Sequence, residues 1–312
     1  MLNENSYEDI HLLENCRLCP KDCRVNRISG KLGYCKAGAG FEIASIDLHK
    51  GEEPVISGET GICNVFFGHC NLQCVFCQNY QISGKECNVR LPFRSLEEVT
   101  LSVKKILNKG ASGLGFVSPS HMVLQMKAII RALREDGYNP VIVYNTSGYD
   151  SVKTLQSLEG WVDVYLPDFK YSDNSLSALW SDTKDYKDIA IKAIKEMYRQ
   201  KGNVLRLNEC GIAENGILVR HLVLPGAVEN SIGVLRLLAE EISSGISLSL
   251  MAQYHPIEKV SATNPLNRKV TASEYLQVAE EAQRLGFQKG WIQDHESSDF
   301  YLPDFESGTP FQ

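Results

Sequence analysis

The 312-residue sequence lacks several features that would assign it to a membrane, secreted or nucleic-acid-binding class. No segment approaches the roughly 18 consecutive apolar residues of a membrane-spanning helix. There is no run of five or more Lys or Arg, and the formal net charge is −6, so there is no strong signal for nucleic-acid binding. The first residues, MLNENSYEDI, do not combine a basic stretch with an apolar one, as a secretory signal does. We therefore expect a globular cytoplasmic protein without membrane attachment.

Cysteine, in contrast, is plentiful: nine of the 10 cysteines lie within the first 87 residues. In a reducing compartment, clustered cysteines bind metals more often than they form disulfides. One group has the spacing C-x2-C-x3-C-x11-C and consists of Cys16, Cys19, Cys23 and Cys35. Another has the spacing C-x3-C-x2-C and consists of Cys70, Cys74 and Cys77. The isolated Cys63, Cys87 and Cys210 are expected to be buried as small apolar residues.

The remainder of the chain alternates short apolar segments with amphipathic ones. Strands are expected at about 62–67, 114–118, 140–145, 162–169, 218–226, 246–256 and 289–294. Helices are expected at about 95–108, 121–136, 185–201, 230–243 and 272–285, with a short one after Asp150. This order predicts an α/β fold with a parallel sheet, either a partial (β/α)6 TIM-type barrel or a doubly wound open sheet. We favour the barrel, with a Cys-rich N-terminal extension at 1–58 and the barrel with its C-terminal segment at 59–312.

The second cysteine group follows the first predicted strand of the barrel, where parallel α/β folds collect functional residues. Three thiolates can bind three irons of a [4Fe–4S] cluster, and the fourth iron is then free to take another ligand. A zinc knuckle is a weaker interpretation, since zinc sites favour four ligands with C-x2-C pairs.

The spacing of Cys70, Cys74 and Cys77, with the aromatic Phe76 before the last cysteine, resembles the radical S-adenosylmethionine superfamily. The similarity extends over about residues 15–310. Segments such as 116–121, 220–226 and 253–256 resemble most closely a branch named after the pyruvate formate-lyase activating enzyme. The resemblance implies that a reduced [4Fe–4S] cluster cleaves S-adenosylmethionine to methionine and a 5′-deoxyadenosyl radical, which abstracts hydrogen from a substrate.

The same resemblance implies which residues bind the cofactor. Ser118 and Ser120 occupy the place of the family's Gly-Gly-Glu turn, which holds the amino group of the methionine moiety. Lys170 resembles the lysine that approaches the methionine carboxylate, and Asp168 and Asn145 resemble residues near a monovalent cation. His255 resembles a histidine that reaches the cofactor. Arg220 lies inside an apolar strand, and burying a guanidinium requires a partner, so we expect it to face a carboxylate inside the barrel.

Several alternatives remain open at this stage. The four N-terminal cysteines are interpreted as a structural zinc site, a second iron–sulfur cluster or reduced thiols. The substrate is either a protein or peptide, as in glycyl-radical activation, or a small molecule or nucleic acid base. An iron–sulfur electron carrier without catalysis is the interpretation from a different class. The radical chemistry also implies a low-potential electron donor such as flavodoxin or ferredoxin.

Overall fold

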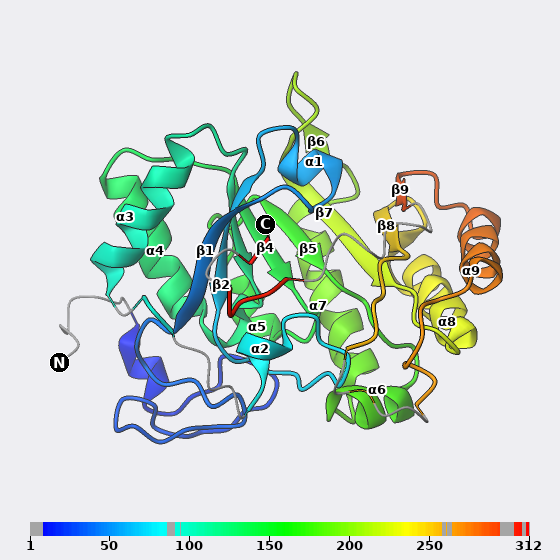
Figure 1. Cartoon of the computed structure of the whole chain (residues 1–312), viewed down its shortest axis with the longest axis horizontal. Coiled ribbons are helices and arrows are strands. Elements are labelled where there is room, and N and C mark those ends of the chain that lie inside the picture. Colours follow the sequence, from blue (N-terminus) through cyan, green and yellow to red (C-terminus); the bar gives the residue numbers. More distant parts are fainter. Residues whose placement is uncertain are drawn as a thin grey trace.

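The computed structural model describes residues 9–85, 91–93, 95–257, 260, 264–293, 303–307 and 310–311. Within them the chain forms a nine-stranded sheet, in the order β1-β2-β3-β4-β5-β7-β8-β9, with β6 paired to β7 (Figure 1). The strands are β1 (Ile43–His49), β2 (Ile62–Phe67), β3 (Leu114–Val117), β4 (Ile142–Thr146), β5 (Val164–Pro167), β6 (Arg206–Leu207), β7 (Ala213–Leu222), β8 (Ser247–Met251) and β9 (Gly290–Ile292). Strands β2 to β5 and β7 to β9 pair in parallel, whereas β1 and β6 pair antiparallel to their neighbours.

Helices connect the parallel strands. They are α3 (Leu96–Leu107), α4 (Val123–Glu135), α5 (Val152–Gln156), α6 (Asn174–Ser181), α7 (Tyr186–Lys201), α8 (Val228–Leu238), the π-helical η4 (Ala239–Ser243) and α9 (Ala272–Arg284). Four shorter helical turns are η2 (Ile10–Leu13), α1 (Pro54–Ser57), α2 (Tyr80–Ser83) and η3 (Pro119–His121). Figure 1 shows helices around the sheet from α3 and α4 at one edge to α8 and α9 at the other. This confirms the predicted α/β partial barrel.

Local sequence explains where the elements begin and why they pack. Ser95 accepts a hydrogen bond from the Glu98 amide, and the Glu98 carboxylate accepts one from the Ser95 amide, so a capping box starts α3 as its sequence predicts. All six residues of β2 are buried, as expected for a strand covered on both faces. In the part of the chain that the structure describes, no helix combines the length and apolarity needed to span a bilayer.

Besides short turns and the two-residue β6, the structure contains β1 and α6, which the apolar pattern did not predict. Strand β1 carries Ser45, Asp47 and His49 among its apolar residues, yet it pairs along the whole of β2. Asp173 caps the N-terminus of helix α6, where its carboxylate accepts a hydrogen bond from the Ser175 amide. Both elements are short and rich in polar residues, so they form because the sheet and the neighbouring α7 offer surfaces to pack against.

The N-terminal segment, residues 9–42, contains a single helical turn and otherwise consists of turns and bends. Side chains tie it to the barrel. Thr154 of α5 donates to the Leu18 carbonyl (2.7 Å), and Gln125 of α4 donates to the Ala39 carbonyl (3.0 Å). Figure 1 shows this segment, in dark blue, at the same end of the molecule as α2.

Candidate functional site

The loop between β2 and α2 borders a cavity of about 200 Å³ that is open to solvent. All three cysteines of the C-x3-C-x2-C group line it. Six further residues that the sequence selected line the same cavity: Phe76, Ser118, Asn145, Asp168, Lys170 and Arg220. Phe76 lies in the cysteine loop itself, and the other five come from the ends of β3, β4, β5 and β7, because the carboxyl ends of neighbouring parallel strands converge. The structure therefore brings together the cysteine loop and most of the predicted cofactor-binding residues.

Each of the three thiols has a polar neighbour. The Leu72 amide donates to Cys70 Sγ (3.4 Å), and the Ser181 hydroxyl donates to Cys74 Sγ (3.0 Å). Cys77 Sγ lies 3.2 Å from the Ser83 hydroxyl. Burial raises the pKa of the Cys74 thiol to about 11, although the nearby Lys170 acts in the opposite direction. A bound metal cation would stabilise the thiolates and so offset the cost of ionising buried thiols.

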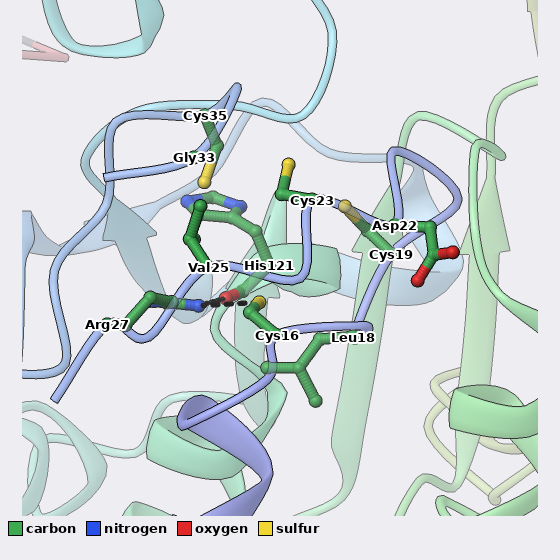
Figure 2. Close-up of a pocket in the computed structure, with 10 residues that line it drawn as sticks. All are labelled: Cys16, Leu18, Cys19, Asp22, Cys23, Val25, Arg27, Gly33, Cys35 and His121. Carbon is green, nitrogen blue, oxygen red and sulfur yellow. Dashed lines mark hydrogen bonds between the residues drawn. The ribbon is translucent and has the colours of Figure 1, made fainter. Parts of the chain in front are cut away.

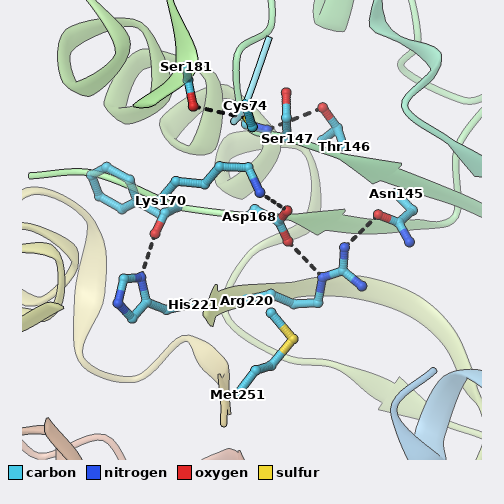
Figure 3. Close-up of polar contacts among 12 residues, drawn as sticks. Cys74, Asn145, Thr146, Ser147, Asp168, Lys170, Ser181, Arg220, His221 and Met251 are labelled. Carbon is cyan, nitrogen blue, oxygen red and sulfur yellow. Dashed lines mark hydrogen bonds and ion pairs between the residues drawn. The ribbon is translucent and has the colours of Figure 1, made fainter. Parts of the chain in front are cut away.

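A buried network of charges crosses the cavity (Figure 3). Asp168 bonds Lys170 Nζ through Oδ2 (2.5 Å) and Arg220 Nε through Oδ1 (2.9 Å). Arg220 also donates to the Asn145 side-chain carbonyl (2.6 Å) and pairs with Glu52 (3.1 Å). The guanidinium is therefore held by groups from β4, from the end of β5 and from the β1–α1 connection.

Electrostatics within this network keeps its members charged. Burial alone would raise the pKa of Asp168, but Arg220 and Lys170 together lower it below its usual range. Burial likewise opposes the charge of Lys170, yet Asp168 and Cys74 raise the pKa of its ammonium. Lys170 is thus a fixed positive charge next to the cysteine loop, a suitable position for binding a carboxylate.

Two of the predicted cofactor-binding residues do not line the cavity. The Ser120 hydroxyl is buried and lies 3.2 Å from the Thr146 hydroxyl, which in turn donates to Asp150 (2.6 Å). His255 follows β8, is half-buried, and its Nδ1 atom has no hydrogen-bond partner among the described residues. Both assignments stay predictions from the resemblance.

Sequence reasoning did not select Glu52, which lines the cavity and pairs with Arg220. It lies on the β1–α1 connection, within the segment assigned to the N-terminal extension. Its only sequence signal is the pair of acidic residues before Pro54, in a region where β1 was not predicted.

The N-terminal cysteines line a separate pocket, together with Arg27 and His121 (Figure 2). Figure 2 shows the side chains of Cys16, Cys19, Cys23 and Cys35 around one space. The close approach of two loops requires Gly33, because a Cβ atom there would lie 2.9 Å from Cys23 Sγ. The next amide, that of Tyr34, donates to the same sulfur (3.2 Å).

Arg27 is almost fully buried beside this pocket, at 2% exposure. Its guanidinium donates to the carbonyl of His121 (2.7 Å), to that of Gly38 and, at 3.9 Å, to Cys16 Sγ. These acceptors carry no full charge if the cysteine is protonated. Negative charge on the cysteines would therefore offset the cost of burying this guanidinium.

His121 connects the two cysteine groups. Its Nε2 atom lies 3.0 Å from the carbonyl oxygen of Gly68, two residues before Cys70. Because a carbonyl only accepts, Nε2 carries the proton, and the buried Nδ1 retains a lone pair without a partner among the described residues. Burial lowers the pKa of His121 to about 3, so the ring is neutral.

The donor atoms of the two cysteine groups limit which metal centres either group could bind. Across the described residues, no three His, Cys, Asp or Glu side chains are arranged to hold a single metal ion. The donors that the structure does gather are sulfurs, which suit iron–sulfur clusters and zinc. The donor chemistry of both groups is therefore compatible with an iron–sulfur cluster or with zinc.

The isolated cysteines have different environments. Cys63 lies fully buried in β2, as predicted. Cys210 is exposed in the turn between β6 and β7, so the prediction that it is buried was wrong. The turn projects from the sheet, as Figure 1 shows, and its two strands have no covering helix there. Cys87 lies outside the described residues.

Comparison with known sequences gives one curated relative and no family. No family model matches the chain. An uncharacterized protein of Methanocaldococcus jannaschii is 26% identical over 281 residues, which cover 88% of this chain and 76% of the relative.

Comparison with solved structures identifies shared folds. The FeFe-hydrogenase maturase HydG from Carboxydothermus hydrogenoformans matches with a TM-score of 0.53 and 14% identity, over 78% of this chain and 56% of HydG. SuiB from Streptococcus suis, in a structure bound to S-adenosylmethionine, matches with a TM-score of 0.50 and 14% identity, over 75% of this chain and 52% of SuiB. The chain thus spans about half the length of these proteins, and what it shares with them is the fold.

Proposed function

We propose that the protein is a radical S-adenosylmethionine enzyme. The observation that carries this proposal is the single cavity that joins a three-cysteine loop to Lys170, Asp168 and Arg220 at neighbouring strand ends. The shared fold with SuiB, a protein whose structure contains S-adenosylmethionine, supports the same conclusion. An iron–sulfur electron carrier without catalysis would require neither a cluster with only three protein ligands nor buried charges beside that cluster.

Cys70, Cys74 and Cys77 would hold three irons of a [4Fe–4S] cluster, and the thiolate donors fit such a group. When bound and reduced, the cluster supplies the electron that cleaves S-adenosylmethionine to methionine and a 5′-deoxyadenosyl radical, which takes a hydrogen atom from the substrate. Lys170 would bind the methionine carboxylate, and Asp168, itself held by Arg220, would keep the Lys170 ammonium charged and oriented. Phe76, Ser118 and Asn145 complete the wall of the cavity.

The finer assignment, a glycyl-radical activating enzyme acting on a protein or peptide, rests on the sequence motifs at 116–121, 220–226 and 253–256. A low-potential flavodoxin or ferredoxin would supply the electron. The second candidate, modification of a small molecule or nucleic acid base, uses the same cavity.

The four N-terminal cysteines would hold a second metal centre. Three observations support this centre. The four cysteines line a common pocket, and the Tyr34 amide donates a hydrogen bond to Cys23 Sγ. The buried Arg27 would offset the negative charge of bound thiolates. The sulfur donors suit either a structural zinc ion or a second iron–sulfur cluster.

Cleavage of S-adenosylmethionine tests the main proposal. Anaerobically reconstituted, dithionite-reduced protein should convert S-adenosylmethionine to 5′-deoxyadenosine. The Lys170→Met variant should bind S-adenosylmethionine about 1.5–3 kcal/mol more weakly, because a charge-assisted hydrogen bond to the carboxylate is lost. Equilibrium dialysis measures this affinity, and Lys153→Met on α5 is a matched control outside the cavity. A reconstituted wild-type protein that neither retains nor cleaves S-adenosylmethionine would refute the proposal.

A further inference from the structure

A second cavity, of about 430 Å³, adjoins the first. It lies between the 50–58 connection and strands β7, β8 and β9. The two cavities share five lining residues: Gly51, Glu52, Arg220, Met251 and Gln253. Arg220 and Met251, both visible in Figure 3, form part of the wall between them. A molecule in the second cavity would therefore lie next to whatever occupies the first.

Glu53 is the distinctive residue of the second cavity. Its Oε2 atom is buried and has no hydrogen-bond partner in the described part of the chain. Burial raises the pKa of this carboxyl group and the neighbouring Glu52 raises it further, whereas Arg220, a backbone amide and a hydrogen bond from Ser249 lower it. A buried carboxylate oxygen without a partner is costly, and such an atom is expected to have a partner in the functioning molecule.

Arg220 attracts Glu53 electrostatically, but neither it nor Lys50 donates a hydrogen bond to the Oε2 atom. Arg220 is engaged by Asp168 (2.9 Å), Glu52 (3.1 Å) and Asn145 (2.6 Å). Lys50 lines the cavity but is exposed to solvent at its edge.

Glu52 is also occupied, because its other oxygen accepts hydrogen bonds from Asn64 (3.0 Å) and Asn145 (3.2 Å). Among the described residues that line this cavity, Glu53 is consequently the carboxylate that has an oxygen available for a ligand.

The rest of the lining fits a cation with an organic stem. Trp291 contributes an indole ring, which attracts an ammonium or guanidinium over its face. Met251 contributes an apolar surface, and Ser249 and Gln253 contribute polar groups.

We propose that this cavity binds the basic group of the substrate, an amine or guanidine, with Glu53 as its counter-ion. The inference rests on the proposed function, since it places the substrate beside the S-adenosylmethionine cavity. The same chemistry is found in a small free guanidine and in the side chain of a peptide lysine, so the experiment includes both sources.

The experiment uses reconstituted holoenzyme in equilibrium dialysis with S-adenosylmethionine and two pairs of probes. One pair is butylguanidine and the neutral butylurea; the other is Nα-acetyl-lysine methylamide and the neutral norleucine analogue. In at least one pair the basic member should bind roughly tenfold to a hundredfold more tightly, the factor expected for a charge-assisted hydrogen bond. Preference in the first pair alone indicates a small-molecule substrate, and preference in the second alone a peptide.

Glu53→Gln should abolish this preference. The matched control Glu59→Gln removes the same charge from an exposed position on the same connection and should retain it. The inference is overturned if neither pair shows the preference in the wild type, a comparison that needs no variant, or if Glu53→Gln retains it. Retention of S-adenosylmethionine in the same dialysis cell reports on the proposed function separately, because its loss would refute that function whatever the probes do.

Discussion

The two cysteine groups occupy different kinds of structure. The Cys70 loop leaves a fully buried strand, and backbone hydrogen bonds fix it, from the His69 amide to Ile82 (2.7 Å) and from the Val75 amide to Trp180 (2.9 Å). The N-terminal group lies on turns, and side chains of Arg27, Gln125 and Thr154 attach its segment to the barrel. The sheet positions the first group, whereas the second depends on a few buried polar contacts.

Both groups nevertheless have a buried cation beside them. Lys170 lies near Cys74, and Arg27 contacts Cys16. Burial raises the pKa of Cys74 to about 11 and that of Cys19 to about 12, so both thiols resist ionisation until a metal binds. The two groups therefore differ more in how the fold holds them in place than in their electrostatic surroundings. Variants can test this difference.

The largest expected effect is on metal content. Replacing Cys70, Cys74 and Cys77 by Ala should remove about four irons and all cleavage of S-adenosylmethionine. Replacing Cys16, Cys19, Cys23 and Cys35 should remove only the second metal. Elemental analysis of both variants measures this, and it identifies iron or zinc at the second site. A seven-cysteine variant with the same metal content as the first variant would show that the N-terminal group binds none.

A smaller effect is expected on stability. Arg27→Met should lower the free energy of unfolding by about 3 kcal/mol, because it leaves the buried carbonyls of Gly38 and His121 without donors. The exposed Arg24 provides a control, since Arg24→Met breaks only a surface pair with Asp22. Denaturant unfolding gives the free energies. Mass-spectrometric alkylation should find Cys16 and Cys19 reactive before Cys70 in Arg27→Met, and equal protection of all three would contradict the proposed attachment.

The smallest effect concerns pH. The pKa of His121 is about 3 in the folded protein, below the ordinary histidine value of 6.5, so the folded state binds fewer protons than the unfolded state. Its contribution to stability is complete above pH 6.5 and declines as the pH falls towards 3. Between pH 7 and 5.5 this group should remove about 1 kcal/mol from the free energy of unfolding. In His121→Gln that part of the pH dependence should vanish, and an unchanged slope would exclude His121 as its source.

The sequence predicted much of the barrel because its strands and helices are marked locally. The capping box at Ser95, the apolar run of β2 and the alternation of elements are properties of neighbouring residues. Strand β1 and helix α6 were missed because long-range packing stabilises them. Cys210 was assigned to the core because residue type alone does not show whether a turn projects from the sheet.

The candidate site divides in the same way. The spacing of the three cysteines and of Asp168 and Lys170 is local, so the sequence by itself determined the cysteine loop and its basic neighbour. Only the tertiary structure placed Glu52 against Arg220, 168 residues away, and left the Oε2 atom of Glu53 without a partner among the described residues, in a neighbouring cavity. It also placed His121 between the two cysteine groups and excluded Ser120 from the cavity wall. Contacts between distant segments depend on how the strands are arranged around the barrel. The spacing of residues in the sequence does not determine that arrangement.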